Sequence, residues 1–305
     1  MINVLDVGCR YGIYPLFKSN INTLNYIGVD ADLEEIKRLK KKYKKYKNIK
    51  FYSHFLSDKR AEVNFNLSKH RGYNSSKKIN PESLWFNFVR KNEKAVDKVI
   101  KLSSIKSGEW INEKIKGKII LKLDIEGGEL DFLNGLSDEN FENIEAVITE
   151  SHFSNPFISN SNFATIFQKL SENQFWLCDL SLEKIKISEY SENQDLVPHS
   201  ATSIFLKKKY LVNDVIARDH LVSSQILFYL KKFSLLIGLC KKIGYSKLKK
   251  NPLFKKIKYE IGHKFNRIEK NQFSLRKINK EFKKIFNDNM LFQSNFNESI
   301  FFNPD

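Results

Sequence analysis

The stretch KIILKLDIEGGELDFLNG, residues 118–135, decides the fold of this chain. Its first part, 119–123, is an apolar run broken only by Lys122, which predicts a strand buried on both faces of a parallel sheet. The glycine pair 127–128 then lets the chain turn, and apolar residues resume at helical spacing from Glu129 onward. The stretch therefore predicts a strand, a loop and a helix in quick succession.

Three carboxylates, Asp124, Glu126 and Glu129, follow this strand at its carboxyl end. Open α/β sheets bind their ligands at that end of the strands. Glu129 has a competing structural role, because an acid in the first turn of a helix favours the helix dipole and can cap the backbone. The cluster predicts a site that needs negative charge or a general base.

Two similar units precede this stretch. Residues 2–7 predict a strand that enters a turn with Gly8 and Gly12, as in nucleotide-binding βαβ folds, although a tight turn without a ligand fits equally well. Residues 25–29 predict a second strand that ends in Asp30. An acid there binds ribose hydroxyls in such folds, and the alternative is that Asp30 or Asp32 caps the next helix.

The rest of the first 209 residues continues the alternation of strands and helices. We expect strands over 49–56, 62–67, 99–102, 144–149, 175–180 and 202–206, and helices over 33–46, 107–116 and 163–170. The strand over 144–149 ends in Glu150 and is followed by His152. Residues 68–97 lack a clear period, which suggests a long loop or cover over the site. The pattern predicts a doubly wound α/β domain over 1–209.

Charge and cysteine content narrow the class of protein. The net charge is +17 and the pI about 9.5. Residues 210–305 hold 19 Lys and Arg against 8 Asp and Glu, a net of +11, which leaves +6 for residues 1–209. Three widely spaced cysteines indicate neither disulfides nor zinc. With no signal peptide or membrane span in the sequence, we expect a cytoplasmic protein.

Five motifs in order, DVGCRYG, GVDAD, FLSDKRAEVNFNL, KLDIEGGELDFLNG and VITESH, resemble the FkbM-type family of S-adenosylmethionine-dependent methyltransferases over residues 1–209. The resemblance implies a Rossmann-like seven-stranded class I methyltransferase sheet and O-methylation of a sugar, a glycan precursor or a related small molecule. It places Asp6, Gly8 and Gly12 around the amino-acid part of the cofactor and Asp30 at the ribose. Residues Leu56, Ser57 and Asp58 would flank the adenine.

Two motifs depart from the family pattern. Cys9-Arg10-Tyr11-Gly12 stands where relatives have Ala-Asn-x-Gly, and Asp30-Ala31 replaces Glu-Pro. Asp30 keeps the charge on a shorter arm, whereas Arg10 adds a cation beside the methionine pocket. The chain also begins at the first strand, without the N-terminal cover of many relatives. An alternative function is therefore a catalytically inactive binding or scaffold protein that acts through its basic tail.

Methyl transfer to a hydroxyl needs a group that removes the proton. Our candidates are Asp124, Glu126 and Glu150, with Glu129 and His152 less favoured. Clustered carboxylates raise one another's pKa, which can tune one of them as a base. They also suit a divalent cation such as Mg²⁺, although no motif specifies that metal.

The tail, 210–305, predicts a basic, mainly helical extension. Apolar residues recur at helical spacing in two segments within 221–286, joined by a lysine-rich link. A helical hairpin packed on the first domain or on a second copy explains this pattern, and docking on an anionic membrane is the functional alternative. We expect no nucleic-acid partner, because no recognition motif is present. The oligomeric state stays open.

Overall fold

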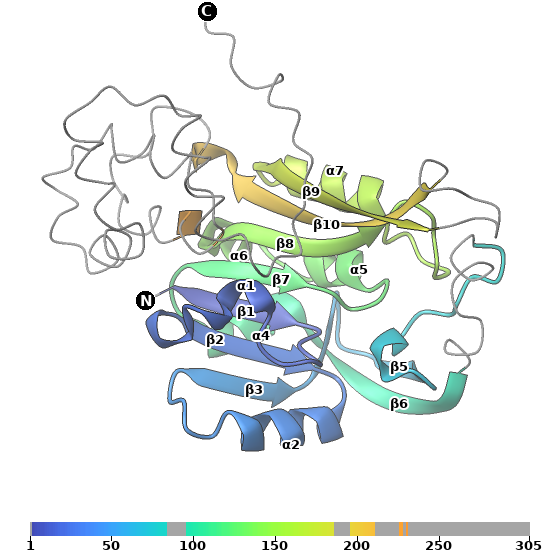
Figure 1. The fold of residues 1–305 in the computed structure, drawn as a ribbon, viewed down its shortest axis with the longest axis horizontal. Helices are drawn as coiled ribbons and strands as arrows, with labels where there is room; N and C mark the ends of the chain where they lie inside the picture. The colour runs from blue at the N-terminus through green and yellow to red at the C-terminus, as the bar shows by residue number, and fades with distance from the viewer. Residues whose placement is uncertain (1, 84–95, 186–195, 211–225, 228–229, 231–305) are drawn as a thin grey trace, which may run out of the picture. The chain divides into compact units, whose positions relative to one another are not determined.

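The computed structural model describes residues 2–83, 96–185, 196–210, 226–227 and 230 (Figure 1). The predicted extension, 210–305, and its two segments within 221–286 lie outside the described residues, except for the few positions just given. Among the described helices, none has both the length and the apolar character to span a bilayer.

The described part of the chain is built on a seven-stranded sheet with the order β3-β2-β1-β7-β8-β10-β9. The first five strands in this order are parallel to their neighbours, and β10 runs antiparallel to both β8 and β9. The strands are β1 (Asn3–Val7), β2 (Asn25–Asp30), β3 (Ile49–Ser53), β7 (Ile119–Leu123), β8 (Ile144–His152), β9 (Phe175–Ile185) and β10 (Val197–Lys207). The Rossmann-like seven-stranded sheet is thus confirmed.

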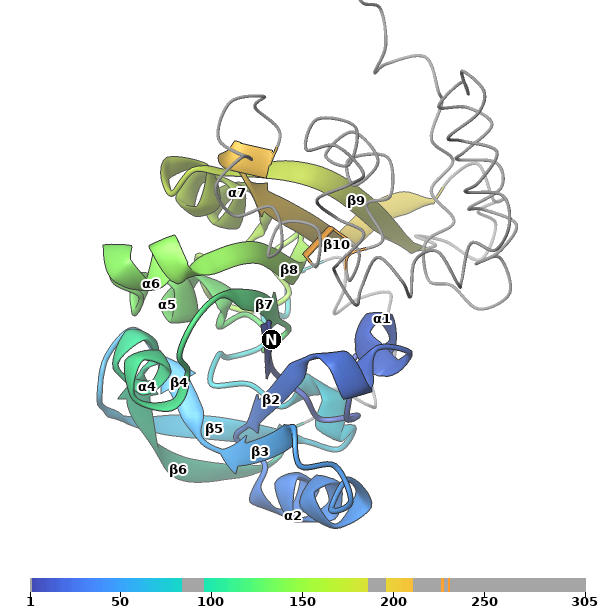
Figure 2. The same ribbon diagram turned by 90° about the vertical axis from the view of Figure 1, so that its left-hand side faces the viewer.

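Helices cover both faces of this sheet. Figure 2 shows α4, α5, α6 and α7 on one face, and α1 with α2 on the other. The chain passes from β1 to β2 and β3 on one side of β1, and then returns through α4 to β7 on its other side, which produces this double winding. The helices are α1 (Pro15–Lys18), α2 (Leu33–Lys42), α4 (Ser107–Lys114), α5 (Glu129–Asn134), α6 (Asp138–Asn143) and α7 (Phe163–Glu172), with short 3₁₀ turns at Ile21–Thr23, Arg71–Tyr73 and Lys208–Tyr210.

Helix α2 begins where the sequence predicts and ends four residues early. The side chain of Asp32 accepts hydrogen bonds from the amides of Glu34 and Glu35, at 3.1 and 3.2 Å, and so caps the helix. The helix ends at Lys42, because the chain must turn to enter β3. The rings of Tyr43 and Tyr46 contact each other from this turn, so the helical spacing of apolar residues outlasts the helix.

A second, three-stranded sheet with the order β4-β6-β5 lies beside the first in the described chain. Its strands are β4 (Phe55–Ser57), β5 (Glu62–Ser68) and β6 (Val96–Lys106). We expected one strand over 49–56, and the structure divides it at His54. There the indole nitrogen of Trp110 donates a hydrogen bond to Nδ1 of His54 at 2.8 Å, and the chain leaves β3 to pair with β6.

One hydrophobic core lies between the sheet and helices α4–α7, and buried residues of α1 and α2 pack on the other face. Strand β7 is buried along its whole length, Lys122 included. Trp110 of α4 and Phe132 of α5 are also buried, at 2% and 0% exposure. Because these apolar side chains are buried and closely packed, they fix the positions of the central strands. The loops at the carboxyl ends of those strands are thereby fixed as well.

Candidate functional site

The strand order reverses between β1 and β7. From β1 the chain passes to β2 and β3 on one side, and then crosses to β7 and β8 on the other. Ligands of open α/β sheets bind in the crevice at such a reversal. A cavity of about 300 Å³ opens there, lined by residues at the ends of β1, β2, β7 and β8, by β4 and by the segment 70–74.

Gly8 brings the loops after β1 and β7 into direct contact. Its φ of +84° lies in the left-handed region, and a Cβ placed on it would lie 1.7 Å from the carbonyl oxygen of Asp124. The amide of Asp124 in turn donates a hydrogen bond to the carbonyl of Val7 at 3.1 Å. Only glycine allows this approach, so the backbone at the centre of the cavity depends on it.

A buried ammonium group links the same two loops. Nζ of Lys122 lies 3.2 Å from Oδ1 of Asp6 and 3.1 Å from Oδ2 of Asp124, and it donates a hydrogen bond to the carbonyl of Gly8. Burial lowers the pKa of Lys122, but the carboxylates of Asp124 and Asp6 outweigh this effect and raise it. Lys122 is therefore a cation that fixes the position of the Asp124 carboxylate.

Asp6 lies behind the cavity. It is 1% exposed, and the hydroxyl of Tyr26 donates a hydrogen bond to its Oδ2. Burial raises the pKa of Asp6, while Lys122 and Tyr26 oppose that rise. Asp6 thus balances the charge of Lys122 and helps to hold it in place.

The loop from Asp124 to Gly128 is held by Glu129. The carboxylate of Glu129 accepts hydrogen bonds from the amides of Ile125 and Gly127, at 2.9 and 3.1 Å, and from the hydroxyl of Ser161 at 3.0 Å. The loop bends sharply, because Glu126 has a φ of +53° and Gly127 a φ of +89°. Backbone strain at a non-glycine residue is typical of functional sites. Glu129 therefore fixes the conformation of the loop, and the loop places Glu126 in the lining of the cavity.

Three carboxylates, from Asp124, Glu126 and Glu150, line the cavity. Burial, followed by the charge of Asp124, raises the pKa of Glu150 to about 8. Burial and the charges of Asp124 and Glu150 raise the pKa of Glu126 well above its usual value. Near neutral pH this cluster holds protons that ordinary carboxyl groups would have lost, and it can exchange them with a bound hydroxyl.

Asp30 lines the opposite side of the cavity, at the end of β2. Its Oδ1 accepts a hydrogen bond from the amide of Asp32 at 2.8 Å, and burial raises its pKa to about 6. Arg10 pairs with Asp32 at 2.8 Å. Because Asp32 caps α2 and binds Arg10, Asp30 is the acid available to a ligand.

The cavity brings together six of the ten residues predicted for the site. They are Gly8, Asp30, Leu56, Asp124, Glu126 and Glu150. Asp6, Gly12, Ser57 and Asp58 lie outside its lining, so their predicted contacts with a cofactor stay predictions. Gly12 faces the end of α2, because a Cβ on it would meet the side chain of Leu39 at 3.3 Å and the hydroxyl of Tyr43, just after the helix, at 3.1 Å. His152 also lies outside the lining, where burial lowers its pKa to about 4.

Other cavity residues were not singled out from the sequence. Tyr11, His54, Phe55 and Phe65 line it, as do residues 70–74. The last segment belongs to the stretch that we expected to cover the site. Its Gly72 lies close to the hydroxyl of Tyr11, so this part of the cover reaches the loop after β1. An aperiodic sequence signals a loop and does not reveal which of its residues face a ligand.

The predicted magnesium site has no ligand set in the part of the chain that the structure describes. There, no group of three or more His, Cys, Asp or Glu side chains is arranged to hold a metal ion. Lys122 occupies the space beside Asp124 with its own positive charge. In the described part of the chain, the ammonium group of Lys122 is thus a cation in direct contact with Asp124.

Comparisons with known proteins give a family and a similarity of structure. Residues 6–177 match the family model described as the methyltransferase FkbM domain. No curated protein matches this sequence. Among solved structures, magnesium protoporphyrin IX methyltransferase from Synechocystis PCC 6803, with bound S-adenosylmethionine, has a TM-score of 0.32 and 12% identity, covering 67% of this chain and 69% of that one. Precorrin-6y C5,15-methyltransferase from Geobacter metallireducens has a TM-score of 0.34 and 7% identity. The match covers 67% of this chain and 78% of that one.

Proposed function

Because this chain belongs to the FkbM methyltransferase family, whose model it matches over residues 6–177, we propose that it transfers a methyl group from S-adenosylmethionine to a hydroxyl of a sugar, glycan precursor or related small molecule. One observation carries the proposal. A single cavity holds Asp30 on one side and the carboxyl groups of Asp124, Glu126 and Glu150 on the other. The acid that we propose for the ribose and the candidate bases therefore face one volume.

The residues present fit this cofactor. Gly8 lines the cavity at the end of β1, and its lack of a side chain lets the carbonyl of Asp124 lie against it, so the two loops border the volume together. Asp30 has a carboxylate free of ion pairs among the described residues, which suits the two hydroxyls of a ribose. A cavity of about 300 Å³ lies within the size range of small-molecule sites. When bound, S-adenosylmethionine supplies a methyl group on a positively charged sulfur.

Among the three carboxyl groups of the cluster, we favour Glu150 as the general base. A hydroxyl must lose its proton as it attacks, and the most effective base has a pKa near the working pH. The pKa of Glu150, about 8, meets this condition. Asp124 is held by Lys122 at 3.1 Å, so it keeps a fixed direction and can accept a hydrogen bond from the acceptor. Glu126 adds a further hydrogen-bond acceptor when it is ionised, and a hydrogen-bond donor when it is protonated.

The acceptor class follows from the same cluster. Several carboxyl groups side by side accept hydrogen bonds from neighbouring hydroxyls, which sugars offer in pairs. A neutral, polyhydroxylated molecule therefore suits the site better than an anion, which the carboxylates would repel. Arg10 does not change this conclusion, because its guanidinium is paired with Asp32.

The test is methyl transfer to a panel of neutral sugars, with phosphate-linked sugars as the anionic comparison, measured as release of S-adenosylhomocysteine. We expect Glu150→Gln to lower the rate by about 10²–10⁴, the usual contribution of a general base, and to leave cofactor affinity unchanged. Glu172→Gln is the matched control, since Glu172 is exposed at the end of α7 and lies outside the cavity lining. An equal loss in both variants would remove Glu150 from this role. Cofactor binding without transfer to any acceptor would favour the inactive scaffold.

A further inference from the structure

A basic surface that the methyl-transfer site does not use lies where α2 ends and β3 begins. Seven lysines fall within residues 40–50, and the sequence has no acidic residue between Glu35 and Asp58. All seven are exposed. This lysine surface consists of Lys40, Lys41, Lys42, Lys44, Lys45, Lys47 and Lys50.

The lysine surface has no internal counter-charge. The two basic residues before it, Lys37 and Arg38, pair with Glu34 and Glu35 at 2.8 and 2.6 Å. Within the described ranges, no ion pair involves any of the seven lysines. The helix dipole accounts for the three lysines of the last turn and does not reach the four beyond it. Their field therefore extends into solvent, where it attracts anions.

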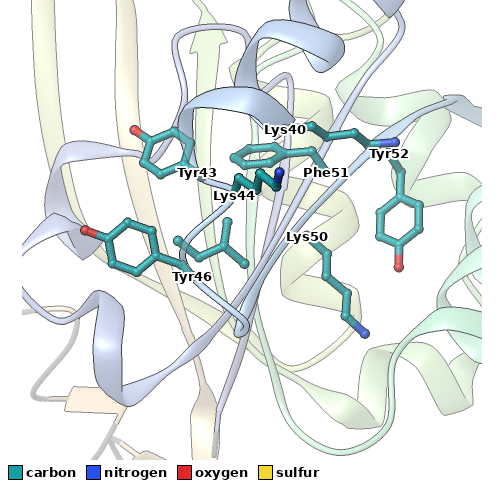
Figure 3. A pocket seen from close by; sticks show the side chains of 8 residues that line it. Lys40, Tyr43, Lys44, Tyr46, Lys50, Phe51 and Tyr52 are labelled. Carbon is teal, nitrogen blue, oxygen red and sulfur yellow. The ribbon is translucent and has the colours of Figure 1, made fainter.

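Three residues of the lysine surface line a shallow hollow of about 280 Å³. Figure 3 shows lysine and aromatic side chains around it, contributed by the end of α2, the turn after it and β3. The lysines among its lining residues are Lys40, Lys44 and Lys50, and the rings are those of Tyr43, Tyr46, Phe51 and Tyr52. Three flexible lysine side chains at one hollow suit a phosphate-bearing head group.

The aromatic rings do not form a platform for nucleic-acid bases. Each ring already has ring or cation partners within the protein. Tyr43 lies 5.6 Å from Phe51 and 6.2 Å from Tyr46, Lys42 lies over Tyr43, Lys45 lies over Tyr46, and Tyr52 stacks on His54. Single-stranded nucleic acids need open ring faces, and their specific contacts favour arginine. The cations here are all lysines, so the surface is less suited to nucleic acid.

We propose that the lysine surface docks the protein on an anionic phospholipid membrane, with the hollow receiving a lipid phosphate. Clusters of four to eight basic residues bind anionic leaflets in this way, and lysine suits a diffuse field of head groups that need no fixed geometry. The strand beside the hollow, β3, is the end strand of the seven-stranded sheet, so no further strand of that sheet covers it. This proposal does not depend on the acceptor.

The test is sedimentation of the full-length protein with vesicles of phosphatidylcholine, with or without phosphatidylglycerol. We expect binding only to the anionic vesicles and a decrease in binding as salt is added. The triple variant K40Q/K44Q/K50Q should bind on the order of 100-fold more weakly, because each lysine near the membrane contributes about fivefold. A matched variant, K59Q/K98Q/K106Q, removes the same charge from exposed lysines elsewhere and should bind within about fivefold of the wild type.

The two triple variants distinguish the lysine surface from other basic parts of the chain. Thermal unfolding of both should match the wild type, since all six lysines are exposed. Equal losses in the two variants, or no loss in either, would place vesicle binding elsewhere in the chain and overturn the proposal. It is also overturned if the wild type binds neutral and anionic vesicles alike. Binding of a single-stranded oligonucleotide that K40Q/K44Q/K50Q weakens, without effect on vesicles, would assign the surface to nucleic acid instead.

Discussion

Replacing Lys122 with methionine tests whether a buried ammonium group holds the site together. Methionine keeps most of the side-chain volume and removes the charge. Lys122 pairs with two carboxylates, which differ in exposure: the side chain of Asp6 is 1% exposed and that of Asp124 is 35% exposed. Water can replace the lost partner at Asp124 but not at Asp6. The cost of Lys122→Met therefore comes mainly from Asp6.

The magnitude follows from that burial. Removing one partner of a buried ion pair leaves an uncompensated charge and costs about 3–5 kcal/mol. Loss of the more exposed ion pair, between Lys122 and Asp124, adds at most about 1 kcal/mol to this cost. We therefore expect Lys122→Met to lower the free energy of unfolding by about 3–5 kcal/mol near neutral pH. A small domain with a total stability of about 5–15 kcal/mol would be close to unfolding.

The loss should depend on pH in a definite direction. Burial raises the pKa of Asp6 above 3.8, and Lys122 is the strongest influence that opposes this rise. Without Lys122 the native pKa rises further, so the folded variant binds a proton that the unfolded chain has released. The stability of the variant then falls as pH rises through the window from 3.8 to the raised pKa, and is regained as pH falls.

Urea unfolding followed by circular dichroism, at about pH 5 and about pH 8, measures both effects. We expect Lys122→Met to lose more of the wild-type free energy of unfolding at the higher pH than at the lower one. The double variant Asp6→Asn/Lys122→Met should be more stable than Lys122→Met by about 1 kcal/mol or more, because it removes the orphaned charge. A deficit below about 1 kcal/mol, or a double variant no more stable than the single one, would refute the reasoning.

Three further predictions follow from the cavity. The methyl-transfer rate of the wild type should rise with pH through about 8, where Glu150 loses its proton, and Glu150→Gln should abolish that rise; a wild-type profile that is flat there would contradict the assignment. Gly8→Ala should cost more than about 1–3 kcal/mol in urea unfolding, because strain from a φ of +84° is added to a clash with the Asp124 carbonyl; wild-type stability would argue against the close approach. Glu129→Gln should cost about 1–3 kcal/mol, since an amide cannot accept all three hydrogen bonds, and an unchanged unfolding midpoint would show that the loop does not rely on them.

The parts of the fold that sequence pattern predicts well are those in which one local rule dominates. The apolar run at 119–123 became β7 with the expected bounds. Asp30 ends β2, and Glu150 follows the last residue of β8 that pairs with β7, although β8 continues to His152; both acids line one cavity. The carboxyl ends of parallel strands lie at one edge of the sheet, so these acids can be predicted from the sequence alone, before any contact between side chains is known.

The remaining features depend on contacts between distant segments. Lys122 interrupts an apolar run in the sequence, and its burial is explained by Asp6 on the neighbouring strand together with Asp124 and the carbonyl of Gly8. His54 divides an expected strand because Trp110, 56 residues later, donates a hydrogen bond to it. The helix predicted through Tyr46 ends at Lys42, since rings in a turn can keep helical spacing. A periodic pattern carries no information about such partners.

The central claim is that the cavity between Gly8 and Asp30 binds the cofactor. Calorimetric titration with S-adenosylhomocysteine tests it most directly, on the wild type, on Asp30→Ala and on the control Glu172→Gln. We expect micromolar binding that Asp30→Ala weakens by at least about 1 kcal/mol, or about fivefold, and that Glu172→Gln leaves unchanged. Absence of binding to the wild type, or equal affinity in wild type and Asp30→Ala, would contradict the account.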